Sequence, residues 1–187
     1  VRVTLRNNTS EAFAGDIVLG IQDGQTCRVP VELAANEERI VALTPEQAAN
    51  LHIDNPRVWW SYELGTPELY RINVQVEADG KVADDKEVTF GIREITSRLN
   101  EFGYRQFYLN GKEILLKGAG WTDDIFLRDT PESLERQVRY VMDMNMNTIR
   151  FENIWGKDDT VYDLCDRLGV LALVGWSCQW EWENYCG

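Results

Sequence analysis

The chain has 187 residues, of which 44% are hydrophobic and 27% are charged, and its formal net charge is −12. This length allows two domains, or one domain and part of another, and the composition is typical of a globular protein. The negative charge would repel a phosphate backbone, and no apolar run approaches the ~18–20 residues of a membrane helix, so we expect neither nucleic acid nor membrane as a partner.

Residues 1–93 read as short strands with alternating apolar and polar residues, separated by turn signals such as Asp23-Gly24 and Asp79-Gly80. The predicted strands cover residues 1–6, 16–22, 27–33, 39–43, 69–77 and 86–90. This spacing is typical of an all-β sandwich, which we assign to residues 1–95. We place Trp59 and Trp60 in this sandwich as core or domain-interface residues, with a sugar-stacking platform as the alternative.

Beyond residue 95 strands alternate with helices. Asn110-Gly111 predicts a type I′ hairpin turn between residues 104–109 and 113–117, and the latter segment leads into residues 118–121. Thr130 and Pro131 predict the start of one helix, and Gly169 predicts the end of a second that begins near Asp158 or Asp159. Buried strands are expected at residues 148–151 and 170–174.

This order predicts parallel βαβ units over residues 96–187. Three parallel strands cannot close a barrel, so we interpret the segment as the first part of a (β/α)₈ TIM barrel, cut from a longer protein. An unclosed barrel exposes a strand edge, and we therefore expect either self-association through residues 170–174 or local disorder near the C-terminus.

Aromatic and carboxylate side chains gather where these strands end, which is where a (β/α)₈ barrel places its active site. The candidates are Trp121, Asp123 and Asp124 after the first strand, Arg150 and Glu152 after the second, and Trp176 after the third. Sugar rings stack on indole, and their hydroxyls bind carboxylates. The alternative is that the aromatic residues close the barrel mouth and the carboxylates are solvated.

Several motifs occur in the order found in glycoside hydrolase family 2, which the chain resembles over nearly its whole length. They are N-P-R-V-W-W at 55–60, P-E-L-Y at 67–70, F-G-I-R at 90–93, F-Y-L-N-G-K-E-I-L-L-K-G at 107–118, N-T-I-R at 147–150 and D-R-L-G-V-L at 166–171. The resemblance implies an immunoglobulin-like sandwich followed by an incomplete TIM barrel.

Within the family, G-W-T-D-D-I-F-L-R at 120–128 is most similar to the exo-β-D-glucosaminidase branch. The resemblance implies a carbohydrate partner, β-linked glucosamine of chitosan-type oligosaccharides, with β-mannosidase as the alternative. The chain departs from the branch pattern at Asp123 and at residues 153–155, which leaves the exact sugar open. Members that attack polysaccharides usually act outside the cytoplasm, so we expect an extracytoplasmic location.

The resemblance implies substrate-positioning roles for Asp124, Arg150 and Glu152. An anion at Glu152 would attract the ammonium group of glucosamine. Arg150 would orient a catalytic carboxylate, or else form a salt bridge inside the barrel. Trp121 and Trp176 would form the floor of the sugar site, with barrel packing as the competing interpretation.

Catalysis itself is expected to depend on residues outside the chain. Retaining members use one carboxyl as acid/base after the fourth strand and a second as nucleophile after the seventh. We therefore expect no catalytic residue among these 187, and no hydrolysis by them alone. The alternative function is a non-catalytic scaffold or carbohydrate-binding module. We expect no cofactor, and four cysteines without a C-x-x-C pair, beside one histidine, argue against a metal site.

Overall fold

The computed structural model describes residues 1–22, 24–124, 126, 128–153 and 159–174. It is rich in β-structure, with two helices longer than two turns, and it divides into two compact units. The first unit contains Val1–Pro56 and Tyr70–Phe90. The second contains Arg57–Leu69 and the described residues from Gly91 onward.

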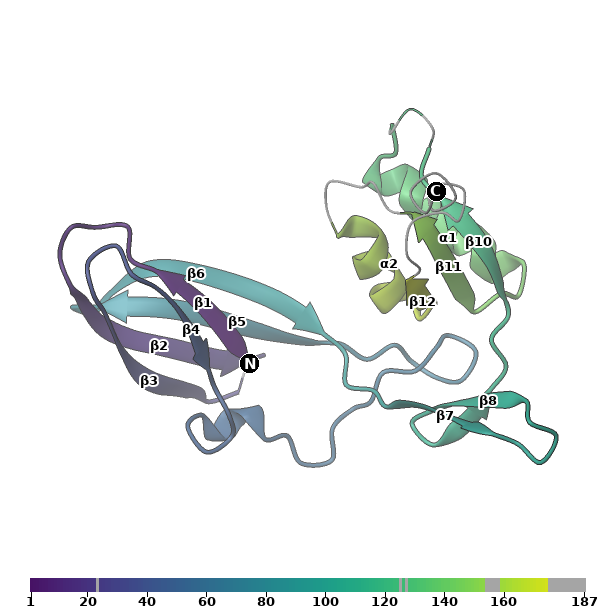
Figure 1. Ribbon diagram of the computed structural model, residues 1–187, viewed down its shortest axis with the longest axis horizontal. Coiled ribbons are helices and arrows are strands. Elements are labelled where there is room, and N and C mark those ends of the chain that lie inside the picture. Colours follow the sequence, from purple (N-terminus) through teal and green to yellow (C-terminus); the bar gives the residue numbers. More distant parts are fainter. Residues whose placement is uncertain (23, 125, 127, 154–158, 175–187) are drawn as a thin grey trace, which may run out of the picture. The chain divides into compact units, whose positions relative to one another are not determined.

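The first unit is built from two antiparallel sheets (Figure 1). Its elements are β1 (Arg2–Arg6), β2 (Phe13–Ile21), β3 (Thr26–Leu33), β4 (Glu38–Ala42), the 3₁₀ turn η1 (Ala49–Leu51), β5 (Tyr70–Ala78) and β6 (Lys81–Phe90). One sheet has the order β3-β2-β5-β6 and the other pairs β1 with β4. Leu5 from one sheet and Ile17, Leu19 and Ile72 from the other share a single apolar core, as expected for two sheets that bury facing sides.

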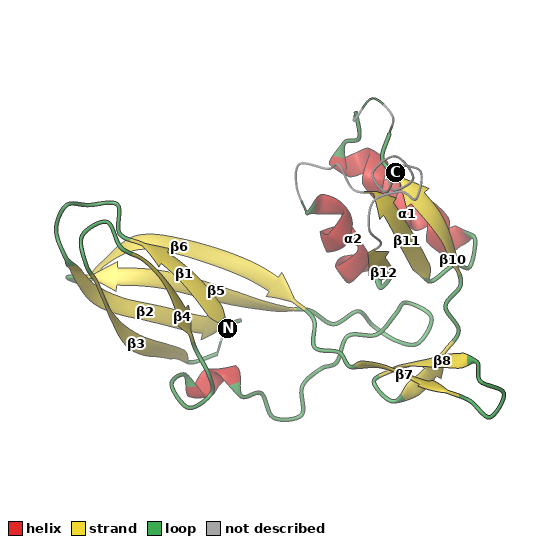
Figure 2. Ribbon diagram, in the orientation of Figure 1, coloured by secondary structure: helices red, strands yellow, loops and turns green. Residues whose placement is uncertain are grey.

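The second unit joins an antiparallel sheet to a parallel one (Figure 2). Its elements are β7 (Ile95–Leu99), β8 (Arg105–Leu109), β9 (Lys112–Ile114), β10 (Gly118–Thr122), α1 (Pro131–Asp143), β11 (Thr148–Asn153), α2 (Thr160–Leu168) and β12 (Leu171–Val174). The parallel sheet has the order β10-β11-β12, so strands that are consecutive in the chain are neighbours in space.

The turn and capping residues predicted from the sequence mark the ends of strands and helices in this unit. Asn110 and Gly111 have φ angles of 48° and 78°, which a type I′ turn requires of both central residues. The Thr130 hydroxyl accepts a hydrogen bond from the backbone N–H of Ser133, and Pro131 follows at the first position of α1. Gly169 ends α2 in the left-handed conformation.

The first parallel strand lies five residues later than the sequence predicted. Residues 112–114 pair with β8 in an antiparallel hairpin, whereas Gly118–Thr122 pairs in parallel with β11. The sequence Gly-Ala-Gly has low strand propensity, and here its small residues permit a close approach of the backbones. A Cβ atom on Gly118 would lie 2.1 Å from the carbonyl oxygen of Thr148.

Trp59 and Trp60 do not belong to the sandwich, contrary to our prediction. The Trp59 side chain is fully buried in the second unit with Leu109, Ile114 and Leu171, and Trp60 packs against the same cluster. The indole Nε1–H donates to the carbonyl oxygen of Asp166 over 2.7 Å. The segment Arg57–Leu69 lies between two sandwich strands in sequence, but long-range burial decides where it packs.

Candidate functional site

Two of the predicted substrate-binding residues, Asp124 and Glu152, lie at the carboxyl ends of β10 and β11, at one edge of the parallel sheet. Asp124 follows β10 by two residues, and Arg150 and Glu152 belong to β11. The side chain of Glu152 and the whole of Trp176 lie outside the described residues. The structure thus puts the backbones of Asp124 and Glu152 at the same edge, because the two strands run parallel.

Arg150 lies on the face of the sheet that the helices do not cover. Its neighbours Ile149 and Phe151 are buried among residues of α1 and α2. Because successive strand residues point to opposite faces, the Arg150 side chain lies on the other side, where it is exposed. Its register partners are Gly120 on β10 and Leu173 on β12. Contact between Arg150 and a ligand or a catalytic carboxylate stays a prediction.

Trp121 lies on the helix-covered face. Its indole meets the Phe151 ring edge-on, with 5.2 Å between ring centroids. Its Nε1–H donates to Gln137 Oε1 on α1 over 2.7 Å. The residue is also part of β10 and does not follow the first strand. This is the packing that the sequence left open as the alternative, and contact between Trp121 and a sugar stays a prediction.

Asp124 organises the loop that follows β10. Its Oδ1 accepts the backbone N–H of Phe126 over 2.8 Å and lies 3.6 Å from Arg128 Nε. The Arg128 guanidinium in turn lies 4.7 Å from the centre of the Phe126 ring, whose residue is 70% exposed. Asp124 therefore has a clear local role, and its contact with substrate stays a prediction.

Asp129 is a residue at this edge that our sequence reasoning missed. Its Oδ2 accepts the backbone N–H of Asp124 over 3.1 Å. Its Oδ1 accepts Gln137 Nε2–H over 2.9 Å and lies 3.0 Å from the Ser133 hydroxyl. The signal in the sequence was its place immediately before the N-cap Thr130, where a carboxylate favours the amino end of a helix.

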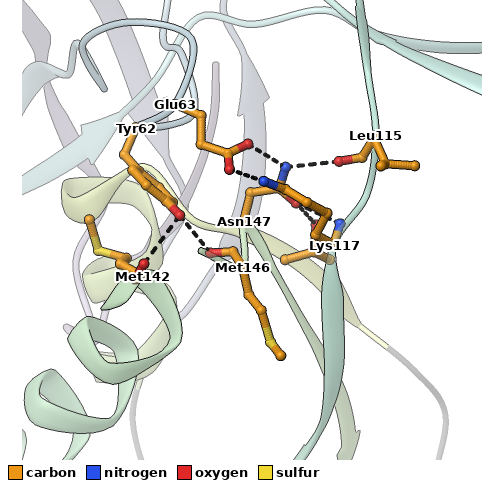
Figure 3. Close-up of polar contacts among 8 residues, drawn as sticks. Tyr62, Glu63, Leu115, Lys117, Met142, Met146 and Asn147 are labelled. Carbon is orange, nitrogen blue, oxygen red and sulfur yellow. Dashed lines mark hydrogen bonds and ion pairs between the residues drawn. The ribbon is translucent and has the colours of Figure 1, made fainter. Parts of the chain in front are cut away.

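A second polar network lies at the opposite, amino-terminal end of the same strands (Figure 3). Asn147, which is fully buried, donates its Nδ2–H groups to Glu63 Oε2 over 2.8 Å and to the Leu115 carbonyl oxygen over 2.9 Å. Its Oδ1 accepts the backbone N–H of Lys117, whose ammonium group pairs with Glu63. The network ties Arg57–Leu69 to residues that immediately precede β10 and β11.

Tyr62 extends this attachment to α1. Its hydroxyl lies 3.1 Å from the carbonyl oxygen of Met146 and 3.4 Å from that of Met142, both near the end of α1 (Figure 3). Burial raises the pKa of this hydroxyl, and the charge of Glu63 adds to the shift. Because these bonds join Arg57–Leu69 to the segments before β10 and β11 and to the end of α1, we interpret the network as structural.

Glu63→Gln is expected to lower the free energy of unfolding by about 2 kcal/mol at pH 7, because a buried amide then loses a charged acceptor. Burial alone would raise the pKa of Glu63, but the hydrogen bonds from Lys117 and Asn147 outweigh it and hold the pKa below its ordinary value. A carboxyl with a lowered folded-state pKa stabilises the fold above its unfolded pKa, and this contribution disappears as pH falls through the folded value.

The measurement is urea unfolding of the 187-residue chain and the variant from pH 7 into the acid range, followed by circular dichroism. The difference in unfolding free energy between the wild-type chain and Glu63→Gln should shrink as pH falls. Glu46→Gln changes an exposed carboxylate in the first unit and serves as the control. A difference in unfolding free energy that stays constant with pH would show that the charge of Glu63 does not stabilise the fold.

The Cys165 thiol of the second unit is poorly suited to chemistry. Burial raises the pKa of the Cys165 thiol to about 12, so it stays protonated and packs as an apolar group. Among the described residues, no group of three or more His, Cys, Asp or Glu side chains could hold a metal ion. Neither helix of the described chain is long and apolar enough to cross a membrane.

Comparisons with known proteins agree with the motifs. The family model described as "Glycosyl hydrolases family 2" matches residues 1–93. An exo-β-D-glucosaminidase of Streptomyces avermitilis is 38% identical over 184 residues, which is 98% of this chain and 20% of that protein. A β-mannosidase of Mus musculus is 27% identical over 177 residues, which is 88% of this chain and 19% of that protein.

Solved structures show the same relationship. A variant of the exo-chitosanase CsxA of Amycolatopsis orientalis, solved as a complex with PNP-β-D-glucosamine, superimposes with a TM-score of 0.85 at 30% identity. The match covers 100% of this chain and 21% of that one. The chain therefore spans about a fifth of the length of these relatives.

Proposed function

This chain belongs to glycoside hydrolase family 2, and on that premise we propose that an enzyme containing it removes terminal β-linked glucosamine from chitosan-type oligosaccharides. The observation that carries the proposal is the 38% identity to an exo-β-D-glucosaminidase over 98% of the chain. Identity to a β-mannosidase is lower, 27% over 88% of the chain.

The proposal includes a finer fold assignment: residues 1–95, apart from the segment Arg57–Leu69 that packs in the second unit, form an immunoglobulin-like sandwich, and residues 96–187 begin a (β/α)₈ barrel. Support comes from the packing of α1 and α2 on the same face of the parallel sheet, through Val138, Leu164 and the β11 residues Ile149 and Phe151. A doubly wound sheet would cover both faces, whereas a barrel keeps its helices outside.

In this proposal the chain supplies binding groups and the rest of the enzyme supplies the reacting carboxyls. A retaining glycosidase needs an acid/base and a nucleophile ~5–5.5 Å apart. We place both on barrel strands outside these 187 residues. Arg150, on the uncovered face of β11, would orient one of them, since a guanidinium stabilises the charged form of a neighbouring carboxylate.

Glu152 is the residue that we assign to the amine. It is the penultimate residue of β11, two residues beyond Arg150, at the edge where parallel strands of a barrel meet the substrate. Glucosamine carries an ammonium group that neutral sugars lack, and charge-assisted hydrogen bonds to a carboxylate are stronger than neutral ones. An acidic chain also favours approach of a cationic polymer.

The second candidate is β-mannosidase activity, which the similarity to the mouse enzyme favours. The third is a non-catalytic role, in which residues 1–95 bind carbohydrate or hold the barrel. Binding of chitooligosaccharide by residues 1–95 would favour the third.

The experiment that separates these functions is hydrolysis of two aryl β-glycosides, a glucosaminide and a mannoside, by a full-length enzyme that contains this chain. We expect kcat/KM for the glucosaminide to exceed that for the mannoside. A preference for the mannoside would contradict the glucosamine assignment, and hydrolysis of neither would contradict the proposed function.

A further inference from the structure

Three hydrogen-bond donors converge on the carboxylate of Asp129, which is half-buried between β10 and α1. They are the backbone N–H of Asp124, the Ser133 hydroxyl and the Gln137 side-chain amide. The Gln137 amide in turn accepts the Trp121 indole N–H. The groups come from the strand, the loop and the helix that together form the edge described above. Asp129 is thus the point at which these three elements are joined.

The direction of each bond is fixed by chemistry. Trp121 Nε1 is only a donor, so Gln137 Oε1 must accept from it, and Gln137 Nε2 must then donate. A backbone N–H is also a donor, as Asp124 is toward Asp129 Oδ2. An ionised carboxylate is an acceptor at both oxygens, and it satisfies donors on both sides at once.

The loop that this arrangement holds contains a group predicted to contact substrate. The Asp124 backbone is fixed through its N–H, and its own Oδ1 holds the Phe126 backbone. Displacement of Asp124 would therefore move Phe126 and Arg128 with it, since both contact Asp124 directly. Such a displacement would weaken the contact that Asp124 is predicted to make with the substrate, because the binding group would no longer be held in place before binding.

We propose that Asp129 is a positioning residue of the sugar site: its carboxylate, held by Gln137, fixes the β10–α1 loop so that Asp124 lies where the substrate binds. This inference rests on the proposed function for its substrate, but the positioning itself does not. Asp129 acts through the Asp124 backbone and does not touch the reacting atoms.

The test is Asp129→Asn in a full-length enzyme that contains the chain. Asparagine keeps the size but has one acceptor oxygen and one donor NH₂. Because Gln137 Nε2 and the Ser133 hydroxyl both donate on one side of Asp129, the acceptor oxygen stays on that side, and the NH₂ faces the Asp124 N–H, which loses its acceptor. We expect KM for the sugar that the wild type hydrolyses to rise about tenfold, as for one charge-assisted hydrogen bond, while kcat changes less than about threefold.

A second measurement, amide hydrogen exchange, reports on the order of the loop independently of enzymatic activity. The Asp124 amide should exchange about tenfold faster in the variant, in line with loss of the same bond. Glu135→Gln is the matched control, because Glu135 on the same helix pairs with Arg139 at the surface over 2.6 Å. It should change neither KM nor exchange at residue 124.

The outcomes distinguish the two proposals. An unchanged KM beside a lowered melting temperature would mean a merely structural role, and unchanged exchange at Asp124 would overturn the inference. Hydrolysis of neither glycoside by the wild type would overturn the proposed function, while exchange would still decide the positioning. If Asp129→Asn does not fold, Gln137→Leu removes the support from the helix side and is expected to give the same two changes.

Discussion

Replacing Trp59 with alanine is expected to lower the free energy of unfolding of the 187-residue chain by about 4 kcal/mol, the range of large aromatic deletions in a packed core. The indole is fully buried, and its Nε1–H donates to the carbonyl oxygen of Asp166 over 2.7 Å. The Arg93 guanidinium lies 4.5 Å from the ring centroid. The change would therefore leave a cavity, an unpaired carbonyl and a cation without its aromatic partner.

Urea unfolding followed by circular dichroism measures this change without relying on tryptophan fluorescence. Tyr104→Ala is the control, because Tyr104 is an aromatic residue of the same unit that is 71% exposed. Surface substitutions of this kind are within about 0.5 kcal/mol of neutral. A loss below about 1 kcal/mol in Trp59→Ala would mean that Arg57–Leu69 is not an integral part of the second unit.

Substitution of Glu152 by glutamine in a full-length enzyme that contains the chain is expected to reduce kcat/KM for an aryl glucosaminide by roughly 100-fold. This is the effect of losing a charge-assisted hydrogen bond to a desolvated ammonium group, ~1.5–3 kcal/mol. Activity toward the corresponding mannoside, which carries no charge, should change by less than about threefold on the same reasoning. The two substrates therefore separate amine recognition from general damage to the site.

Glu101→Gln removes the same charge from the hairpin turn between β7 and β8 and is the matched control. Equal losses on both substrates in Glu152→Gln would assign Glu152 to the chemistry of the reaction in place of amine recognition. No loss on either would remove Glu152 from the site.

Self-association through the edge of β12 stays a prediction, and the C-terminus, for which we expected local disorder as the alternative, lies outside the residues that the structure describes. Among the described residues β12 pairs with β11, and Leu173 and Val174 are 50% and 61% exposed. The location of the enzyme outside the cytoplasm is likewise a proposal.

Features specified by adjacent residues could be predicted from the sequence. Asn110-Gly111 forms the expected turn because both residues tolerate positive φ, and Thr130 caps α1 because its hydroxyl reaches the N–H of Ser133 three residues later. Gly169 ends α2 because glycine, too, tolerates the positive φ of the left-handed conformation. The family, too, was visible in motifs that are contiguous in the chain.

The tertiary structure alone decided features that depend on residues far apart. Trp59 was assigned to the sandwich because its neighbours in sequence are sandwich strands, yet it packs with Leu109 and Leu171. Gly118–Thr122 became a strand because β11 pairs with it, not through its own propensity. Trp121 turned to the helix side because Phe151 and Gln137 are there. Turns and caps are set by bonds within a few residues, whereas the packing face and pairing partner of a segment depend on which distant surfaces bury it.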